Sequence, residues 1–118
     1  MNQKPKDEIF EGYSGEMRAD SPWLAAEDID GRGDVKVTIV ACHRHKDVKF
    51  EEGRSVAVAY SLEFKGKQRR LILNVTNRRR LVAHFGPDVK AWAGKEITLY
   101  IDPKVRLMGK TVSGIRIR

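Results

Sequence analysis

The segment that decides the fold is LILNVTNRRRLVAHFGP, residues 71–87. Apolar and polar side chains alternate up to residue 75, the period of a β-strand with one buried face. We expect this strand to begin near Arg69. From Thr76, which we expect to cap a helix, the apolar spacing becomes that of a helical stripe over residues 81–85. Gly86 and the proline after it end the helix. A strand therefore runs directly into a helix.

The same alternation predicts strands on both sides of this segment. It places two strands before it, over residues 35–42 and 56–64, and two after it, over residues 97–107 and 111–118. In the second strand we expect the even-numbered residues to face the core, Tyr60 included. The polar stretch 43–54 reads as a long loop. Residues 65–67 read as a tight hairpin turn.

Three strands, a helix and two strands are the element order of the five-stranded OB fold, a Greek-key β-barrel that binds oligonucleotides and oligosaccharides. We therefore predict an all-β domain with little helix over residues 21–118. Residues 1–20 are rich in charge, Gly and Ser and are expected to form a flexible N-terminal arm. The aromatic residues expected in the core are Trp23, Tyr60, Phe64, Phe85 and Trp92.

Charge divides the 118-residue chain into two unlike halves. The net charge is +7, but residues 1–64 sum to −4 and residues 65–118 to +11. A basic half of this strength favours a polyanionic partner, because Lys and Arg neutralise phosphates and release counterions. No apolar run is long enough to span a membrane, and the polar N-terminus does not read as a signal peptide. With Cys42 as the single cysteine, we expect a cytoplasmic protein.

From Trp23 onward the chain resembles a family of small proteins encoded by bacteriophages and prophages. The resemblance rests on residues 23–29 (WLAAEDI), 71–77 (LILNVTN), 85–88 (FGPD), 92–100 (WAGKEITLY) and 114–118 (GIRIR), together with Gly109-Lys110. That family is similar to OB-fold single-stranded DNA-binding proteins. The resemblance implies an accessory to phage replication or recombination. The loop over residues 43–54 and the acidic arm depart from the family pattern.

A single-strand binder needs a basic groove for phosphates and planar groups that stack on bases. Cations gather in the two loops that flank the OB binding face and around the first hairpin. The candidate nucleic-acid-binding residues are Arg44, Lys46, Lys49, Phe50, Lys65, Lys67, Arg69, Arg70, Tyr100, Lys104, Arg106, Lys110 and Arg116. Among these only Tyr100 and Phe50 are aromatic, and Arg70 and Arg116 could stack through their guanidinium planes. Few stacking groups predict weak, salt-sensitive binding.

Two asparagines, Asn74 and Asn77, lie where the third strand meets the helix. An amide there could read a base edge or a phosphate, but we favour a bond to the backbone. We predict no enzyme activity and no cofactor. The Cys42–His45 cluster has too few ligands for a structural zinc site, and Cys42 with His43 lacks a third group to orient it as a nucleophile.

The partner is predicted to be single-stranded nucleic acid, DNA in preference to RNA. A protein-interaction OB module, an adaptor or a virion-associated part, is the alternative. The sequence selects no oligomeric state.

Overall fold

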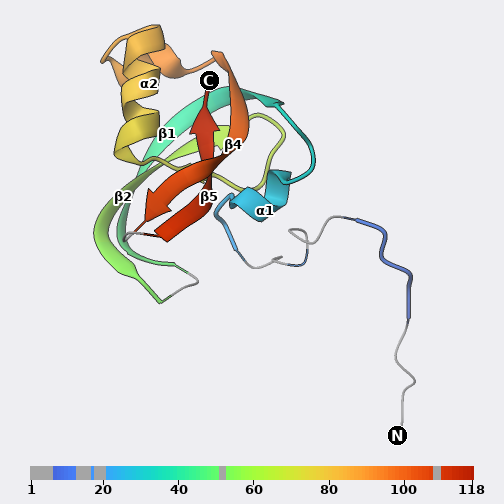
Figure 1. Cartoon of the computed structure of the whole chain (residues 1–118). Coiled ribbons are helices and arrows are strands. Elements are labelled where there is room, and N and C mark those ends of the chain that lie inside the picture. Colours follow the sequence, from blue (N-terminus) through green and yellow to red (C-terminus); the bar gives the residue numbers. More distant parts are fainter. Residues whose placement is uncertain (1–6, 13–16, 18–20, 51–52, 108–109) are drawn as a thin grey trace, which may run out of the picture.

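The computed structural model describes residues 7–12, 17, 21–50, 53–107 and 110–118, and of residues 104–107 and 110–113 only the backbone. Two helices, a 3-10 turn and five strands form its body (Figure 1). In chain order they are α1 (Ala26–Ile29), β1 (Val35–Lys49), β2 (Ser55–Phe64), β3 (Leu71–Ile72), α2 (Val75–Phe85), η2 (Val89–Trp92), β4 (Glu96–Leu107) and β5 (Lys110–Ile117).

The five strands form one antiparallel sheet in the order β3-β2-β1-β4-β5. Strand β1 holds the sheet together, because its first residues pair with β4 and the remainder pairs with β2. The register shifts between Ile39 and Ala41, where the strand passes from one partner to the other. The predicted β-rich class, the five strands and the position of α2 between β3 and β4 are confirmed. In the part of the chain that the structure describes, no ladder joins β3 to β5.

The first strand is much longer than predicted. Residues 43–49, expected in a loop, continue β1 as far as Lys49. His43 pairs with Ser61, and Val48 pairs with Val56. The prediction was wrong because the charged side chains hide the strand period. A polar strand is stable here, since its backbone bonds are satisfied by the partner strand and its side chains reach water.

The second strand buries the face that its alternation predicts only at its end, where Leu62 and Phe64 are core residues. Val58 and Tyr60 are 48% and 47% exposed, although both were expected inside. Ser61 and Ala59, on the opposite face, are buried. The reason is that this end of the β1–β2 hairpin extends beyond the core. On the opposite face, His45 of β1 contacts Ser61, with its Nε2 2.7 Å from Ser61 Oγ.

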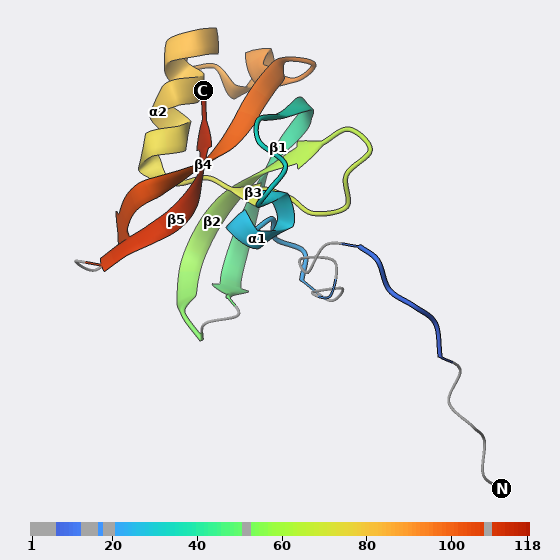
Figure 2. The ribbon, with the colours of Figure 1, turned by 45° about the vertical axis from the view of Figure 1, so that its right-hand side comes forward.

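The segment before α1 packs on the same face, because the Trp23 ring contacts His45. Trp23 forms a parallel bridge with Arg70 at the outer edge of β3. Arg70 N–H donates to the Pro22 carbonyl, and Leu24 N–H donates to the Arg70 carbonyl. Residues 22–24 therefore extend the sheet by a short stretch beside β3, and Trp23 is half-buried rather than in the core. Figure 2 shows α1 and this segment at the end of the sheet remote from α2.

Helix α2 begins two residues earlier than predicted. Asn74, and not Thr76, is the N-cap, and its side-chain oxygen accepts from Asn77 N–H at 2.8 Å. The helix ends at Phe85, and its C-cap, Gly86, has a φ of 88°, a positive value that glycine adopts without strain. Leu81 buries the helix against the core. Among the described residues no helix is long and apolar enough to cross a lipid bilayer.

The core lies between the two halves of the sheet and α2. Its most buried apolar side chains are Ile39, Leu62, Leu81 and Leu99. Phe64 and Trp92 are core residues as predicted, and Phe85 is partly buried against the same cluster. The Trp92 ring N–H donates to the Gly86 carbonyl, which satisfies the only polar atom of that side chain.

Candidate functional site

Four ring side chains gather on one face of the β1–β2 hairpin, and we call them the ring cluster: Trp23, His43, His45 and Phe50. The ring centroids of Trp23 and His45 lie 5.0 Å apart in an edge-on arrangement, and those of Trp23 and Phe50 lie 6.5 Å apart. The two histidine rings are 6.3 Å apart. All four side chains are half-buried, so each still presents part of its surface to solvent.

The positions of these rings follow from the strand geometry. His43 and His45 are two residues apart on β1 and therefore point to the same side of the sheet. Trp23 reaches that side from the bridge beside β3, and Phe50 follows the last residue of β1. Phe50 is held by a backbone turn, in which its N–H donates to the Arg54 carbonyl.

Polar partners fix both histidines from β2. His43 Nε2 lies 2.7 Å from Glu63 Oε1, and His45 Nε2 lies 2.7 Å from Ser61 Oγ. Glu63 also lies 3.9 Å from the Arg70 guanidinium. These contacts restrict the rotation of the rings. A rigid ring loses little entropy when a flat ligand stacks on it.

Cations surround the ring cluster. The Arg54 guanidinium lies 4.5 Å from the centre of the Phe50 ring, a cation–π distance. Desolvation, with the positive charges of Arg70 and His43, holds the pKa of His45 below its ordinary value of 6.5. His45 is therefore neutral at pH 7 and presents an uncharged ring.

The opposite face of the hairpin carries cations beside exposed apolar side chains. Arg44 pairs with Tyr60, and Lys46 pairs with Val58, across the two strands. All four of these side chains are exposed. Tyr60, predicted in the core, is therefore an exposed aromatic residue beside the cations of β1.

The structure separates the predicted site residues into several groups. Arg44, Lys46 and Lys49 are exposed on β1, and Lys65 and Lys67 are exposed in the turn after β2. Phe50 and Arg70 belong to the ring cluster and its surroundings. Arg69 forms an ion pair with the buried carboxylate of Asp28, so its charge has a structural partner.

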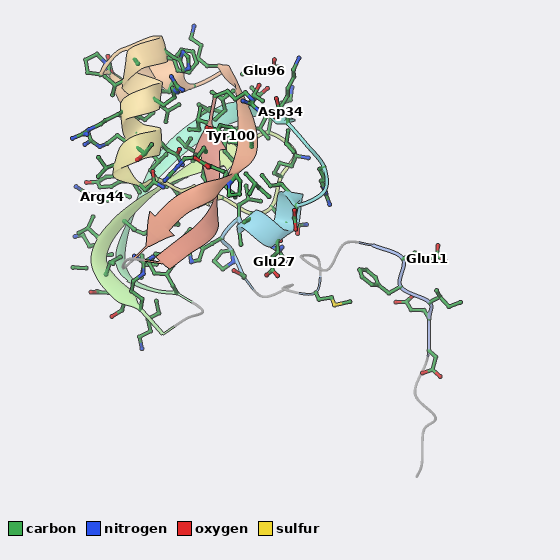
Figure 3. The ribbon with its side chains drawn as sticks, in the orientation of Figure 1. Glu11, Glu27, Asp34, Arg44, Glu96 and Tyr100 are labelled. Atoms are coloured by element: carbon green, nitrogen blue, oxygen red, sulfur yellow. The ribbon has the colours of Figure 1, made fainter. Side chains whose placement is uncertain are left out.

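Tyr100 and Arg116 lie elsewhere, on the β4–β5 ribbon, where they face each other across the strands. The Arg118 guanidinium lies 4.2 Å from the centre of the Tyr100 ring and makes two 2.8 Å bonds to Asp34. These bonds lower the pKa of Asp34. Tyr100 is therefore half-buried under Arg118. Figure 3 shows Asp34 and Tyr100 well away from Arg44.

Three predicted residues, Lys104, Arg106 and Lys110, have side chains outside the described part of the structure. Their backbone lies in β4 and β5, at the end of the ribbon where Leu107 pairs with Lys110.

Both asparagines bond to the backbone, as we favoured. Asn77 is 1% exposed. Its side-chain N–H donates to the Ile115 carbonyl at 3.0 Å, and its oxygen accepts from Ile117 N–H at 3.3 Å. Asn77 thus ties α2 to β5 and is not available to a ligand.

Cys42 and His43, considered above as a nucleophile and its base, both lie in β1. Burial raises the pKa of the Cys42 thiol, which keeps it protonated at neutral pH. Cys42 and His43 are consecutive in β1, so their side chains point to opposite faces. Among the described residues no group of three His, Cys, Asp or Glu side chains is placed to hold a metal ion.

Trp23, His43, His45 and Arg54 were missing from the predicted site. Trp23 was expected in the core, and the other three were expected in a loop with no fixed neighbours. The signal that could have found them is the spacing of His43 and His45, which places both rings on one side if the strand continues.

Chemically, the site can stack flat groups on its rings, attract anions through Arg54 and Arg70, and accept hydrogen bonds at Glu63.

No family model, no curated protein and no solved structure matches the chain.

Proposed function

We propose that this chain is an OB-fold module that binds single-stranded nucleic acid, DNA in preference to RNA, on the face of strands β1–β3 that carries the ring cluster. The strand order β3-β2-β1-β4-β5, with α2 between β3 and β4, is the order of an OB barrel opened between β3 and β5. The proposal also draws on the resemblance to a family of small phage- and prophage-encoded proteins, which is similar to OB-fold single-stranded DNA-binding proteins and implies a role in phage or prophage replication or recombination.

The ring cluster is the observation that carries the proposal. Proteins that bind single strands without sequence preference combine aromatic side chains with a cationic path for the backbone. Trp23, His45 and Phe50 supply rings, and Arg54 and Arg70 supply nearby positive charge. Lys49 adds an exposed positive charge at the end of β1, whereas Arg44 and Lys46 lie on the opposite face of the hairpin.

Intrinsic fluorescence offers a direct test, because the chain has two tryptophans in different surroundings. Trp23 is half-buried in the ring cluster, whereas Trp92 is 3% exposed in the core. A stacked base quenches the ring that it contacts, so oligo(dT) should quench Trp23 and leave Trp92 unchanged. Trp23→Phe should abolish the quenching while retaining binding, since phenylalanine also stacks.

Affinity measurements then weigh the contribution of each ring. Loss of one stacking ring costs about 1–3 kcal/mol, or roughly a factor of 5–150 in Kd. We expect Phe50→Ala to weaken binding of labelled oligo(dT) by this factor in fluorescence anisotropy, while Val89→Ala, an exposed residue of η2, leaves it unchanged. Equal affinities for both variants, or no binding at low salt, would reject the proposal.

A protein-binding module is the second candidate, and the exposed Val58 and Tyr60 favour it. Neighbouring apolar side chains on one strand face are typical of protein contacts. A partner captured from a nuclease-treated lysate by the native chain, and lost with Val58→Asp, would support this candidate. If nuclease removes every partner, this candidate is excluded.

A further inference from the structure

A pocket of about 710 Å³ opens between α1, the first half of β1 and the turn after β2. Its apolar lining is Pro22, Leu24, Ile29, Val35, Val37, Phe64 and Leu99. Most of these side chains belong to the core cluster or pack against it, so the pocket reaches the end of the core. Its volume is that of a site for a ligand or for a few side chains.

The rim of the pocket is positively charged. Arg32, Lys67 and Arg69 line it together with one acid, Asp28, which gives a net charge of +2. Arg69 forms an ion pair with Asp28, and both Arg32 and Lys67 are exposed. An apolar floor with a cationic rim suits an apolar group that is flanked by carboxylates.

The chain itself contains a segment with this chemistry. Ile9 and Phe10 are 87% and 51% exposed, and they lie between Asp7-Glu8 and Glu11 in the sequence. Two adjacent large apolar side chains in water are unfavourable by about 25 cal/mol per Å² of exposed apolar surface. The charge of residues 7–12 is −3, opposite in sign to that of the pocket rim.

The pocket lies within reach of this segment. Ser21 and Pro22, which follow the arm, are themselves part of the pocket wall. The eleven residues from Phe10 to Ser21 can span up to about 36 Å, more than the 30 Å shortest extent of the molecule. A tether of this length gives a local concentration on the order of millimolar, so even a weak contact is populated.

We propose that this pocket is the docking site of the chain's own acidic segment, residues 7–12, with Ile9 and Phe10 inside it and the carboxylates facing Arg32 and Lys67. The structure shows the segment undocked: Figures 1 and 2 show it leading away from the body beside α1, and Figure 3 places Glu11 far from the sheet. Docking buries apolar surface both on the segment and in the pocket. It goes beyond the proposed nucleic-acid function and does not depend on it.

Paramagnetic broadening in the full chain tests the docking without any nucleic acid present. A nitroxide is attached at Gly12→Cys in a Cys42→Ala background, and the methyl signals of Ile29, Val37 and Leu99 are observed. We expect strong broadening of these signals. Phe10→Ser should return them to their diamagnetic intensity, and Lys67→Glu should reduce the broadening. Met17→Ser, an exposed apolar residue outside the segment, is the matched control and should change nothing.

Two results would overturn the proposal. One is the absence of broadening, or broadening that Phe10→Ser leaves intact, which would show that the apolar pair does not enter the pocket. The other comes from mixing isotope-labelled chains with spin-labelled, isotope-free chains. Broadening that is as strong in this mixture would assign the occupant to a second copy and reject docking within one chain. Because Phe10 is exposed, its substitution leaves the fold intact, and unshifted core signals check this.

Discussion

Substitution of Asn77 should lower the stability of the fold strongly, although three exposed arginines follow it in α2. Its buried side chain donates to the Ile115 carbonyl and accepts from Ile117 N–H. Asn77→Ala leaves both backbone groups without these bonds. Each buried group left unsatisfied costs about 1–3 kcal/mol, so we expect a loss of about 3 kcal/mol or more of unfolding free energy.

Urea unfolding followed by circular dichroism measures this loss. With a slope of about 1–3 kcal/mol per molar urea, a 3 kcal/mol loss moves the midpoint down by about 1–3 M. Asn77→Asp should be at least as destabilising, because its carboxylate would face the Ile115 carbonyl in place of a donor. Arg79→Ala, an exposed substitution in the same helix, is the matched control and should change stability by less than about 0.5 kcal/mol.

A loss below about 1 kcal/mol for Asn77→Ala would refute the reasoning. It would mean that water or a shift of α2 satisfies Ile115 and Ile117, and that the helix is not anchored to β5 by this side chain. Binding of oligonucleotides by the folded fraction should stay unchanged, because the amide does not reach the ring cluster.

The remaining predictions concern three titratable or charged sites. The pKa of His45 is lowered in the folded state, so the unfolded chain binds more protons as pH falls below 6.5. His45 therefore lowers the free energy of unfolding at those pH values and has no effect at higher pH. His45→Gln should make the thermal midpoint depend less on pH between about pH 5 and pH 7. The raised pKa of Cys42 predicts slow alkylation of the folded chain by iodoacetamide, as measured by mass spectrometry. Unfolding in urea should accelerate the alkylation. Equal rates for the folded and the unfolded chain would contradict the burial of the thiol. Arg69→Ala removes the ion pair of the Asp28 carboxylate, whose side chain is 7% exposed, and should lower the free energy of unfolding by about 3–5 kcal/mol. The double variant Arg69→Ala, Asp28→Asn should recover part of that loss. Equal stability of the two variants would count against a buried charge at Asp28.

The sequence predicted the elements in which apolar residues recur with the period of a strand or a helix. Residues 35–42, 71–87 and 97–107 alternate or repeat clearly, and the structure forms strands and a helix there. The third strand is shorter than predicted, because β3 covers only Leu71–Ile72 and Val75, expected on its buried face, is the exposed first residue of α2. The sequence did not predict the second half of β1, where charged residues and histidines occupy both faces. Nor did it predict that Tyr60 is exposed, because residue type alone does not say where a hairpin leaves the core. The ring cluster depends on Trp23 crossing to β3, a contact between distant segments that no local pattern encodes.

The two pairings of β1 have different consequences for the order of folding. The β1–β2 hairpin closes over a short connection between Lys49 and Ser55, and such hairpins form in about 1–10 μs. Val37 pairs with Ile97, sixty residues away along the chain, so that closure carries a much larger entropy cost and comes later. The register shift between Ile39 and Ala41 then marks the boundary between an early and a late cooperative unit. Amide exchange should therefore divide a single strand into two kinetic classes at that boundary.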